Sequence, residues 1–319
     1  MRNTLIACIV ALASTVASAQ TDWPTKPVRI IVPYTPGGFT DQVARIVAQK
    51  LQDRIKQPIT IDNKPGANSI VGVEAAVKSP PDGYTFVLVI AAFSANPSLY
   101  AKLPYDTRKD LVPVSLVGIG PLIAAVNNEM PVKTPKELVD YAKANPGKIS
   151  FGSSGNGSAA HLTTELFKST TKTDMVHIPY KGAAPAMVDL LGGRIQLLFD
   201  AATGLIPNGK AGKIRLIGVS ADRRLAAAPD VPTFAEQGYP GFIGSTWAGV
   251  LAPAGTPAPI VQRMSTEIAA IVRLDDVRAK FDEMGIVPVG GTPPEFDQFI
   301  VSEIDKWGKV IRDAKVTAD

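Results

Sequence analysis

Apolar runs of strand length alternate with amphipathic segments of helix length along almost the whole chain, and this alternation restricts the possible folds most. In the first third, strands are expected at 28–32, 59–63 and 85–90, with helices at 41–55 and 70–78. Segments that alternate in this way pack as parallel sheets with helices on their faces. The sequence therefore predicts the α/β class.

The elements expected after residue 110 continue this pattern. Two extended runs, at 111–118 and 122–127, are separated by Gly120-Pro121. Thr134-Pro135 with Glu137 is typical of a capping box that opens a helix. Further strands are expected at 149–151, 175–180, 195–199, 214–220 and 245–252, and further helices at 159–168, 185–191, 257–272, 276–284 and 294–314.

These elements fall into two βαβαβ blocks, 20–118 and 120–244, and a mostly helical end that has too few strands for its own sheet. We expect this end to return and cover the first block. The chain then crosses twice between lobes, near 118–121 and 241–245, which creates a hinge and an interlobe cleft for a small ligand. The expected lobes are 20–119 plus 245–319, and 120–244.

The first nineteen residues, 1–19, have the features of a signal peptide. Arg2 supplies a positive charge, an apolar stretch follows, and Ala17-Ser18-Ala19 fits a cleavage site. Cleavage there removes Cys8, the only cysteine, which excludes disulfides and thiolate chemistry in the remaining chain. We therefore expect an exported protein that relies on its apolar core for stability.

The charges carry little functional information. The formal net charge is +4, and the basic residues are scattered rather than clustered. No run of lysines and arginines resembles a surface that follows a nucleic acid, so no nucleic-acid partner is expected.

Two glycine-rich turns each connect a strand to a helix. The first contains Gly37 and Gly38, followed by Phe39 and Thr40 at the helix start. Glycine lets a ligand approach the backbone, and the free N–H groups at a helix start bind anions. The second turn contains Ser154, Gly157 and Ser158. We expect the N–H groups of 37–40 and 154–158 to hold a carboxylate, assisted by the hydroxyls of Ser94, Ser154 and Ser158.

Other chemistries fit the sequence less well. Gly155, Gly157 and Ala160 match a dinucleotide-binding pattern, but Tyr180 rather than an acidic residue ends the next strand. The chain has no G-x-S-x-G nucleophile elbow and no HExxH zinc motif. The sequence therefore predicts no enzyme activity, no metal and no cofactor.

Several side chains have two interpretations that the residues alone leave open. His161, near the start of the second ligand-loop helix, could contact the anion or pack in the core, and His177 is expected to be structural. Phe93 could line the site or belong to the core. Asp200 ends a strand at the edge where α/β proteins bind ligands, but it could equally cap the turn at 201–204.

We expect Phe39 to pack on the body of the ligand, and Tyr180 and Asp200 to hydrogen-bond its far end, directly or through water. An ionised Asp200 repels a second carboxylate, so mono- and dicarboxylates both remain open.

The chain resembles the extracytoplasmic solute receptors of tripartite tricarboxylate transporters, the Bug or TctC family. The resemblance extends over essentially the whole sequence and depends on many modest motifs in a fixed order. These motifs are Trp23-Pro24-Thr25-Lys26-Pro27, Pro36-Gly37-Gly38 with Asp41, Asn63-Lys64-Pro65-Gly66-Ala67-Asn68, Pro80-Pro81-Asp82-Gly83-Tyr84, Leu103-Pro104-Tyr105-Asp106, Pro179-Tyr180-Lys181-Gly182, and Leu251-Ala252-Pro253-Ala254-Gly255-Thr256-Pro257.

The resemblance implies a type II periplasmic binding protein fold whose lobes close on a small carboxylate, aliphatic or aromatic. It further implies that backbone groups and water from both lobes, rather than an arginine clamp, hold the carboxylate. The implied protein is a periplasmic monomer that delivers its ligand to large and small membrane transporter subunits. Two alternatives remain: a sensory receptor that presents its ligand to a membrane kinase, and a secreted hydrolase.

Overall fold

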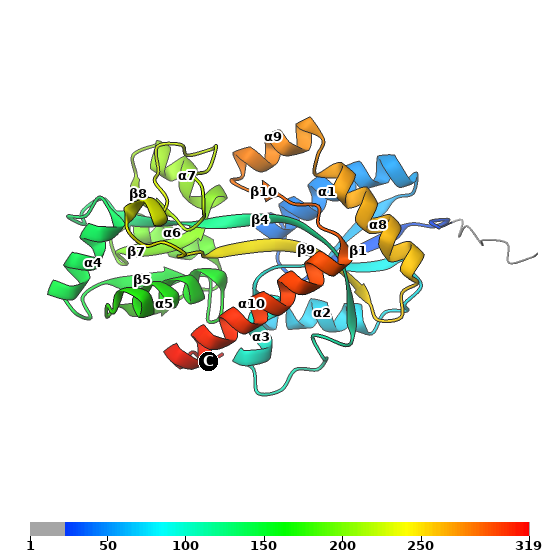
Figure 1. Cartoon of the computed structure of the whole chain (residues 1–319), viewed down its shortest axis with the longest axis horizontal. Coiled ribbons are helices and arrows are strands. Elements are labelled where there is room, and N and C mark those ends of the chain that lie inside the picture. The colour runs from blue at the N-terminus through cyan, green and yellow to red at the C-terminus, as the bar shows by residue number, and fades with distance from the viewer. Residues whose placement is uncertain (1–22, 319) are drawn as a thin grey trace, which may run out of the picture.

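The computed structural model describes residues 23–318, and its elements are labelled in Figure 1. The segment expected to be a signal peptide lies outside the described residues. One ten-stranded sheet runs through the molecule in the order β2-β1-β3-β9-β4-β7-β5-β6, with β8 and β10 paired to β4. Helices cover both faces of this sheet, as the α/β pattern predicts.

The first end of the sheet is a parallel unit. β1 (Val28–Val32) lies between β2 (Ile59–Asn63) and β3 (Thr85–Val89), and all three are parallel. α1 (Phe39–Ile55) and α2 (Ile70–Val77) connect them. Sequence reasoning placed these three strands within one residue, because each is a short, buried apolar run between turn residues.

The other end repeats this arrangement. β5 (Ser150–Ser153) lies between β7 (Leu197–Ala201) and β6 (Val176–Pro179), again in parallel. α5 (Ala159–Thr171) and α6 (Ala183–Leu191) connect them.

Two antiparallel strands join the ends, which corrects the expectation of purely parallel sheets. β4 (Leu111–Asn127) pairs with β9 (Ser245–Pro253) along its first part and with β7 and β8 (Ile214–Val219) along its last part. We call the strands on the β9 side of this switch the first half-sheet (β2, β1, β3, β9, β10 and β4 up to 121). The second half-sheet comprises β4 from 122 onward with β7, β5, β6 and β8.

The prediction that Gly120-Pro121 separates two extended runs was wrong, because β4 continues through them. Pro121 is the last residue paired with β9, and Leu122 is the first paired with β7. Proline lacks an N–H donor, and here it stands where the strand changes its partner, so the ladder loses little.

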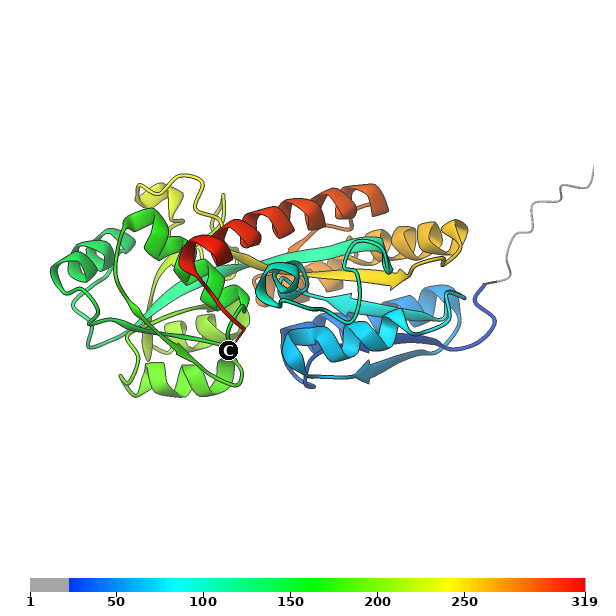
Figure 2. The same cartoon turned by 90° about the horizontal axis from the view of Figure 1, so that it is seen from below.

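The C-terminal segment does more than cover the first half-sheet. α8 (Ala258–Ile271) and α9 (Asp275–Glu283) pack there, and β10 (Val287–Pro288) pairs with β4. α10 (Pro293–Ala314), red in Figure 2, crosses to the second half-sheet. Its Trp307 lies in one buried cluster with Ala95 and with Leu162 of α5, so the final helix contacts both halves.

Some elements differ from the sequence predictions. α3 (Ala92–Leu99) and α7 (Ala202–Lys210) were not expected as helices, and the expected turn at 201–204 is the start of α7. α4 (Pro135–Ala144) is capped by Thr134, whose hydroxyl accepts from the Glu137 N–H. Glu137 itself accepts from the Lys133 N–H, so the predicted capping box is only half formed. Within residues 23–318 there are also two 3₁₀ turns, η2 (Ala67–Ser69) and η3 (Ala235–Gln237).

Candidate functional site

The turn between β1 and α1 is fixed by a buried aspartate. Asp41 is 2% exposed and accepts hydrogen bonds from Gly37 N–H (2.9 Å), Arg45 Nε (2.8 Å) and Asn63 Nδ2 (3.0 Å). Burial opposes its ionisation, but these hydrogen bonds outweigh that effect and lower the pKa of Asp41. Gly37 adopts φ +86°, which favours glycine. Sequence reasoning assigned Asp41 no role, although a carboxylate in the first helical turn was visible.

The start of α1 keeps its backbone donors available for a ligand. Gly38 is the N-cap residue and has no side chain to accept the N–H groups that follow it. The N–H groups of Phe39 and Thr40 precede the first intrahelical bond, which Gln42 N–H donates to Gly38 C=O. These groups and the helix dipole make an anion-binding position. The N–H groups of Phe39 and Thr40 are thus placed for the anion expected here, whereas the Gly37 N–H, also expected to bind it, already donates to Asp41.

Phe39 lies where the two half-sheets meet. Its half-buried ring packs against the cores of both. A Cβ added at Gly120 would lie 3.1 Å from this ring and 3.3 Å from Thr246, so the ring sits directly on the β4–β9 ribbon. Part of the Phe39 ring is therefore covered by packing within the protein, and the rest of the ring is exposed.

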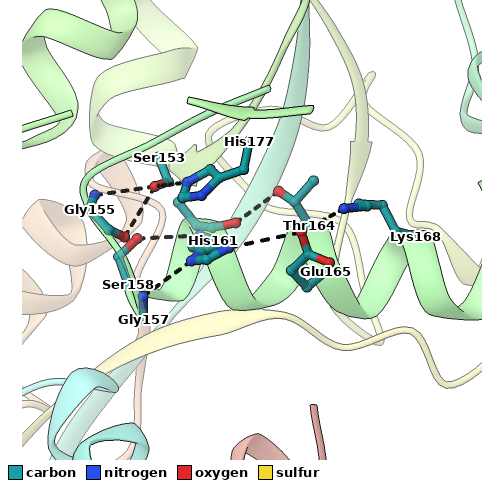
Figure 3. Close-up of polar contacts among 10 residues, drawn as sticks. Ser153, Gly155, Gly157, Ser158, His161, Thr164, Glu165, Lys168 and His177 are labelled. Atoms are coloured by element: carbon teal, nitrogen blue, oxygen red, sulfur yellow. Dashed lines mark hydrogen bonds and ion pairs between the residues drawn. The ribbon is translucent and has the colours of Figure 1, made fainter. Parts of the chain in front are cut away.

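The second glycine-rich loop uses several of its own donors. Gly155 N–H donates to Ser153 Oγ (3.2 Å), Ser158 N–H to Gly155 C=O (3.2 Å), and Gly157 N–H to His161 Nδ1 (3.2 Å), as Figure 3 shows in part. Ser158 caps α5 by accepting from His161 N–H. Of the five N–H groups expected to bind an anion, three are therefore engaged within the loop.

Two stacked histidines hold this loop in place through hydrogen bonds to Ser153 and Gly157. The rings of His161 and His177 stack with centroids 3.6 Å apart, and His177 Nε2 hydrogen-bonds Ser153 Oγ at 2.7 Å (Figure 3). Burial, followed by repulsion from His177 and Lys168, lowers the pKa of His161 to about 3. Burial and Lys168 lower that of His177 to about 4. Both are neutral near pH 7, and His161 holds the loop backbone through Nδ1.

The second loop also touches the first half-sheet. A Cβ at Gly157 would lie 2.2 Å from Leu99 of α3 and 3.5 Å from Nδ2 of Asn68 in η2. Sequence reasoning missed this contact, because Gly157 is 58 positions from Leu99 and 89 positions from Asn68 along the chain. Gly157 therefore serves two purposes: it leaves room for Leu99, and its N–H donates to His161.

Two hydroxyls expected in the site have other partners. Ser94 is fully buried in α3, and its Oγ donates to Ala91 C=O at 2.8 Å. The Tyr180 hydroxyl donates to Asp189 of α6 at 2.7 Å. Burial, with this hydrogen bond, raises the pKa of Tyr180 to about 12.

Two other residues differ in exposure. Phe93 is fully buried in the core of the first half-sheet, whereas Ser154 is exposed on the second loop.

Asp200 stands at the end of β7 with little to neutralise it. Its carboxylate accepts from the N–H of Ala201 (2.8 Å), and burial raises its pKa to about 6. The helix that follows begins at Ala202, and no side chain caps it. Because Ala201 precedes the helix, this bond does not satisfy a first-turn N–H group.

Residues 23–318, the described part of the chain, contain neither a metal-ligand cluster nor a membrane-spanning helix. In this part of the chain, no three His, Cys, Asp or Glu side chains are placed to hold a metal ion. In the same part, no helix combines the length and apolar character needed to cross a bilayer.

Comparison with known proteins places this geometry in a family. Residues 43–316 match the sequence profile of the tripartite tricarboxylate transporter family receptor, TctC. Protein BugT of Bordetella pertussis is 37% identical over 312 residues, which cover 97% of this chain and 96% of BugT.

Solved structures agree with this assignment. Rpa4515 of R. palustris with adipate is 36% identical, with a TM-score of 0.85 over 92% of this chain and 99% of that one. MatC (Rpa3494) from Rhodopseudomonas palustris with bound malate is 29% identical, with a TM-score of 0.80 over 91% and 100%. The α/β periplasmic binding protein fold expected from the sequence is confirmed. The chain belongs to the TctC family of tripartite tricarboxylate transporter receptors, which are solute-binding proteins rather than enzymes.

Proposed function

We propose that this receptor captures a small carboxylate in the periplasm and delivers it to the large and small membrane subunits of a tripartite tricarboxylate-type transporter. The observation that carries the proposal is the start of α1, where Gly38 offers no side-chain cap and the N–H groups of Phe39 and Thr40 precede the first intrahelical bond. Relatives whose structures contain adipate and malate support a carboxylate, since both molecules are dicarboxylates.

One ligand carboxylate binds at the start of α1 and meets the second loop from the other half of the molecule. Because Gly155, Gly157 and Ser158 donate within that loop, its contribution comes from Ser154, Asn156 and the first residues of α5. His161 and Gly157 position this loop, whereas Ser94 and the Tyr180 hydroxyl keep their internal partners.

The ligand body packs on the exposed part of the Phe39 ring, and its far end reaches Asp200. A carboxyl with a pKa of about 6 exists in both forms near neutral pH. Protonated Asp200 donates a hydrogen bond to a second carboxylate, so the site accepts dicarboxylates as well as monocarboxylates.

We also propose that residues 1–19 direct export and are removed, and that the protein acts as a monomer. Its lobes, 20–119 plus 245–319 and 120–244, close around the ligand by bending at the two crossings. The β4–β9 ribbon supports this proposal, because it is the sheet connection shared by both halves.

The test is the Gly38→Val substitution. Gly38 has φ −77° and a Cβ there meets nothing closer than 3.9 Å, so the fold accepts the side chain while the ligand does not. Calorimetry with succinate, adipate, malate and benzoate should show binding of at least one by the wild type and none by the variant. Gly192→Val, at the end of α6 where a Cβ lies 3.4 Å from its nearest neighbour, is the matched control. Unchanged affinity in Gly38→Val would remove the first loop from the site.

A further inference from the structure

A cavity of about 670 Å³ lies at the junction of the two half-sheets, away from both glycine-rich loops. One wall is the segment after β8, from Arg223 to Pro229. The other wall is formed by the end of α8, by α9 and by β10, from Val272 to Val289. In Figure 1 the yellow-green loop beside α7 is the first wall, and it faces α9 and β10 of the second wall.

The cavity is lined by four arginines and one acid, Asp282. Arg224 is neutralised, because its Nε donates to both carboxylate oxygens of Glu236 (2.9 and 3.1 Å) and its Nη1 to Pro229 C=O. Among residues 23–318, the guanidiniums of Arg223, Arg273 and Arg278 have no hydrogen-bond or ion-pair partner. Three unpaired cations from two separate walls thus share one concave space.

The two walls are in direct contact beside the cavity. Gly285 adopts φ +67°, and a Cβ there would lie only 2.3 Å from the Cβ of Ala202, the first residue of α7. Leu225 lies 3.4 Å from the same position. Gly285 and Leu225, one from each wall, therefore pack closely beside the cavity.

We propose that this cavity binds a small multivalent anion, such as a polycarboxylate or an oligophosphate, at a site distinct from the α1 carboxylate site. Guanidinium groups bind carboxylate and phosphate oxygens in a planar, two-pronged geometry. Asp282 offsets one of the three free arginine charges, so three positive charges less one negative charge leave the lining a formal charge of +2. An anion with two or more negative charges matches this balance better than one with a single charge. The volume is within the range of about 300–1,000 Å³ typical of small-molecule sites.

The test is calorimetry with pyrophosphate and with citrate at constant ionic strength, on the wild type and on Gly38→Val. Because Gly38→Val should not bind a carboxylate at α1, probe binding that is the same in both proteins must occur at another site. We expect saturable binding of at least one probe in both proteins. Arg223→Gln and Arg278→Gln should each weaken it at least tenfold, and Arg273→Lys, which keeps the charge, should weaken it less than Arg273→Gln.

Arg312→Gln is the matched control, because it removes one positive charge from the exposed face of α10. Thermal melts establish that each variant is folded. The proposal is overturned if neither probe binds saturably to the wild type, or if Arg312→Gln weakens binding as much as the cavity variants. Binding that is lost in Gly38→Val but kept in the arginine variants would instead assign the probe to the α1 site.

Discussion

In the proposed site, Asp200 is the residue whose charge state should most affect ligand choice. Burial stabilises its neutral form, and the pKa of about 6 means that it ionises between pH 5 and pH 7. Below that range the carboxyl donates a hydrogen bond to a second ligand carboxylate, and above it the two anions repel each other. We therefore expect dicarboxylate affinity to fall several-fold from pH 5 to pH 8.

Calorimetry across this range checks the prediction, with a monocarboxylate as the reference ligand. Asp200→Asn should remove the difference in pH dependence between the two ligands, because the amide donates at every pH. If the variant keeps the wild-type ranking and pH profile, Asp200 is outside the site.

The stacked histidines make the fold sensitive to acid. His161 and His177 have pKa values of about 3 and 4 when folded, but about 6.5 when unfolded. Between these values the unfolded chain binds more protons, so stability is full above pH 6.5 and falls as the pH decreases toward 4 and 3. Each histidine contributes a slope of up to about 1.4 kcal/mol per pH unit. Urea unfolding from pH 7 to pH 4 measures it.

His177→Phe is the informative variant, because a phenyl ring still stacks on Phe151 but binds no proton. It should flatten the stability profile in this pH range while it lowers stability at pH 7 through loss of the Ser153 hydrogen bond. An unchanged slope would show that other groups cause the acid sensitivity.

At the scale of single elements, η2 is the strained part of the structure. Ala67, Asn68 and Ser69 all have positive φ angles, 44°, 49° and 79°, although none is glycine. Hydrogen bonds to Asn96 compensate: the Asn68 side-chain Nδ2 donates to Asn96 Oδ1, and the Asn68 backbone C=O accepts from Asn96 Nδ2, both at 2.9 Å. Non-glycine residues in this region cost about 1–2 kcal/mol each.

We predict that Asn68→Ala destabilises the protein by about 1–3 kcal/mol, because it removes a hydrogen bond and leaves a buried polar partner. Asn68→Gly loses the same side chain but gains backbone freedom, so it should be more stable than Asn68→Ala. Chemical unfolding of the three proteins checks the order. Equal stability of the two variants would show that the backbone conformation is not strained.

Most elements could be predicted because their apolar spacing is regular. The exceptions have physical causes. α3 is buried almost all round and contains Pro97, so it shows neither helical periodicity nor a polar face. α7 contains Gly204, Pro207 and Gly209, which are typical of loops. Gly120-Pro121 reads as a strand break, but a partner strand from residue 245 onward continues the pairing there.

The site could be predicted only in part. Glycines before a helix indicate a backbone anion position, and the structure keeps that geometry at Gly38. Which N–H groups are free depends on side-chain conformation, as with the Gly157 N–H that donates to His161. The contacts between Gly157 and Leu99 depend on tertiary packing, so no local pattern in the sequence reveals them.

At the scale of the whole molecule, the closure proposed above involves the β4–β9 ribbon and α10, which contacts both halves. The register of the ribbon shifts between Pro113 and Ser115 and between Leu116 and Gly118, where added twist is easiest. We expect a bound carboxylate to bring the lobes together by bending of this ribbon. Small-angle scattering should then show a smaller radius of gyration at saturating ligand.

The Gly38→Val variant, which does not bind, is the control and should give one curve with and without the carboxylate. Superimposable wild-type curves at saturating ligand, with binding verified by calorimetry, would contradict closure.

The position of β9 also determines the order in which the chain can fold during its synthesis. β9 lies between β3 and β4 in the first half-sheet, yet it is residues 245–253, whereas every strand of the second half-sheet is complete by residue 219. The second half-sheet can therefore form before residues 245–253 are available, whereas β3 and β4 keep open edges until β9 reaches them. Strands from the first part of the chain thus depend on a segment from its last quarter to complete their sheet.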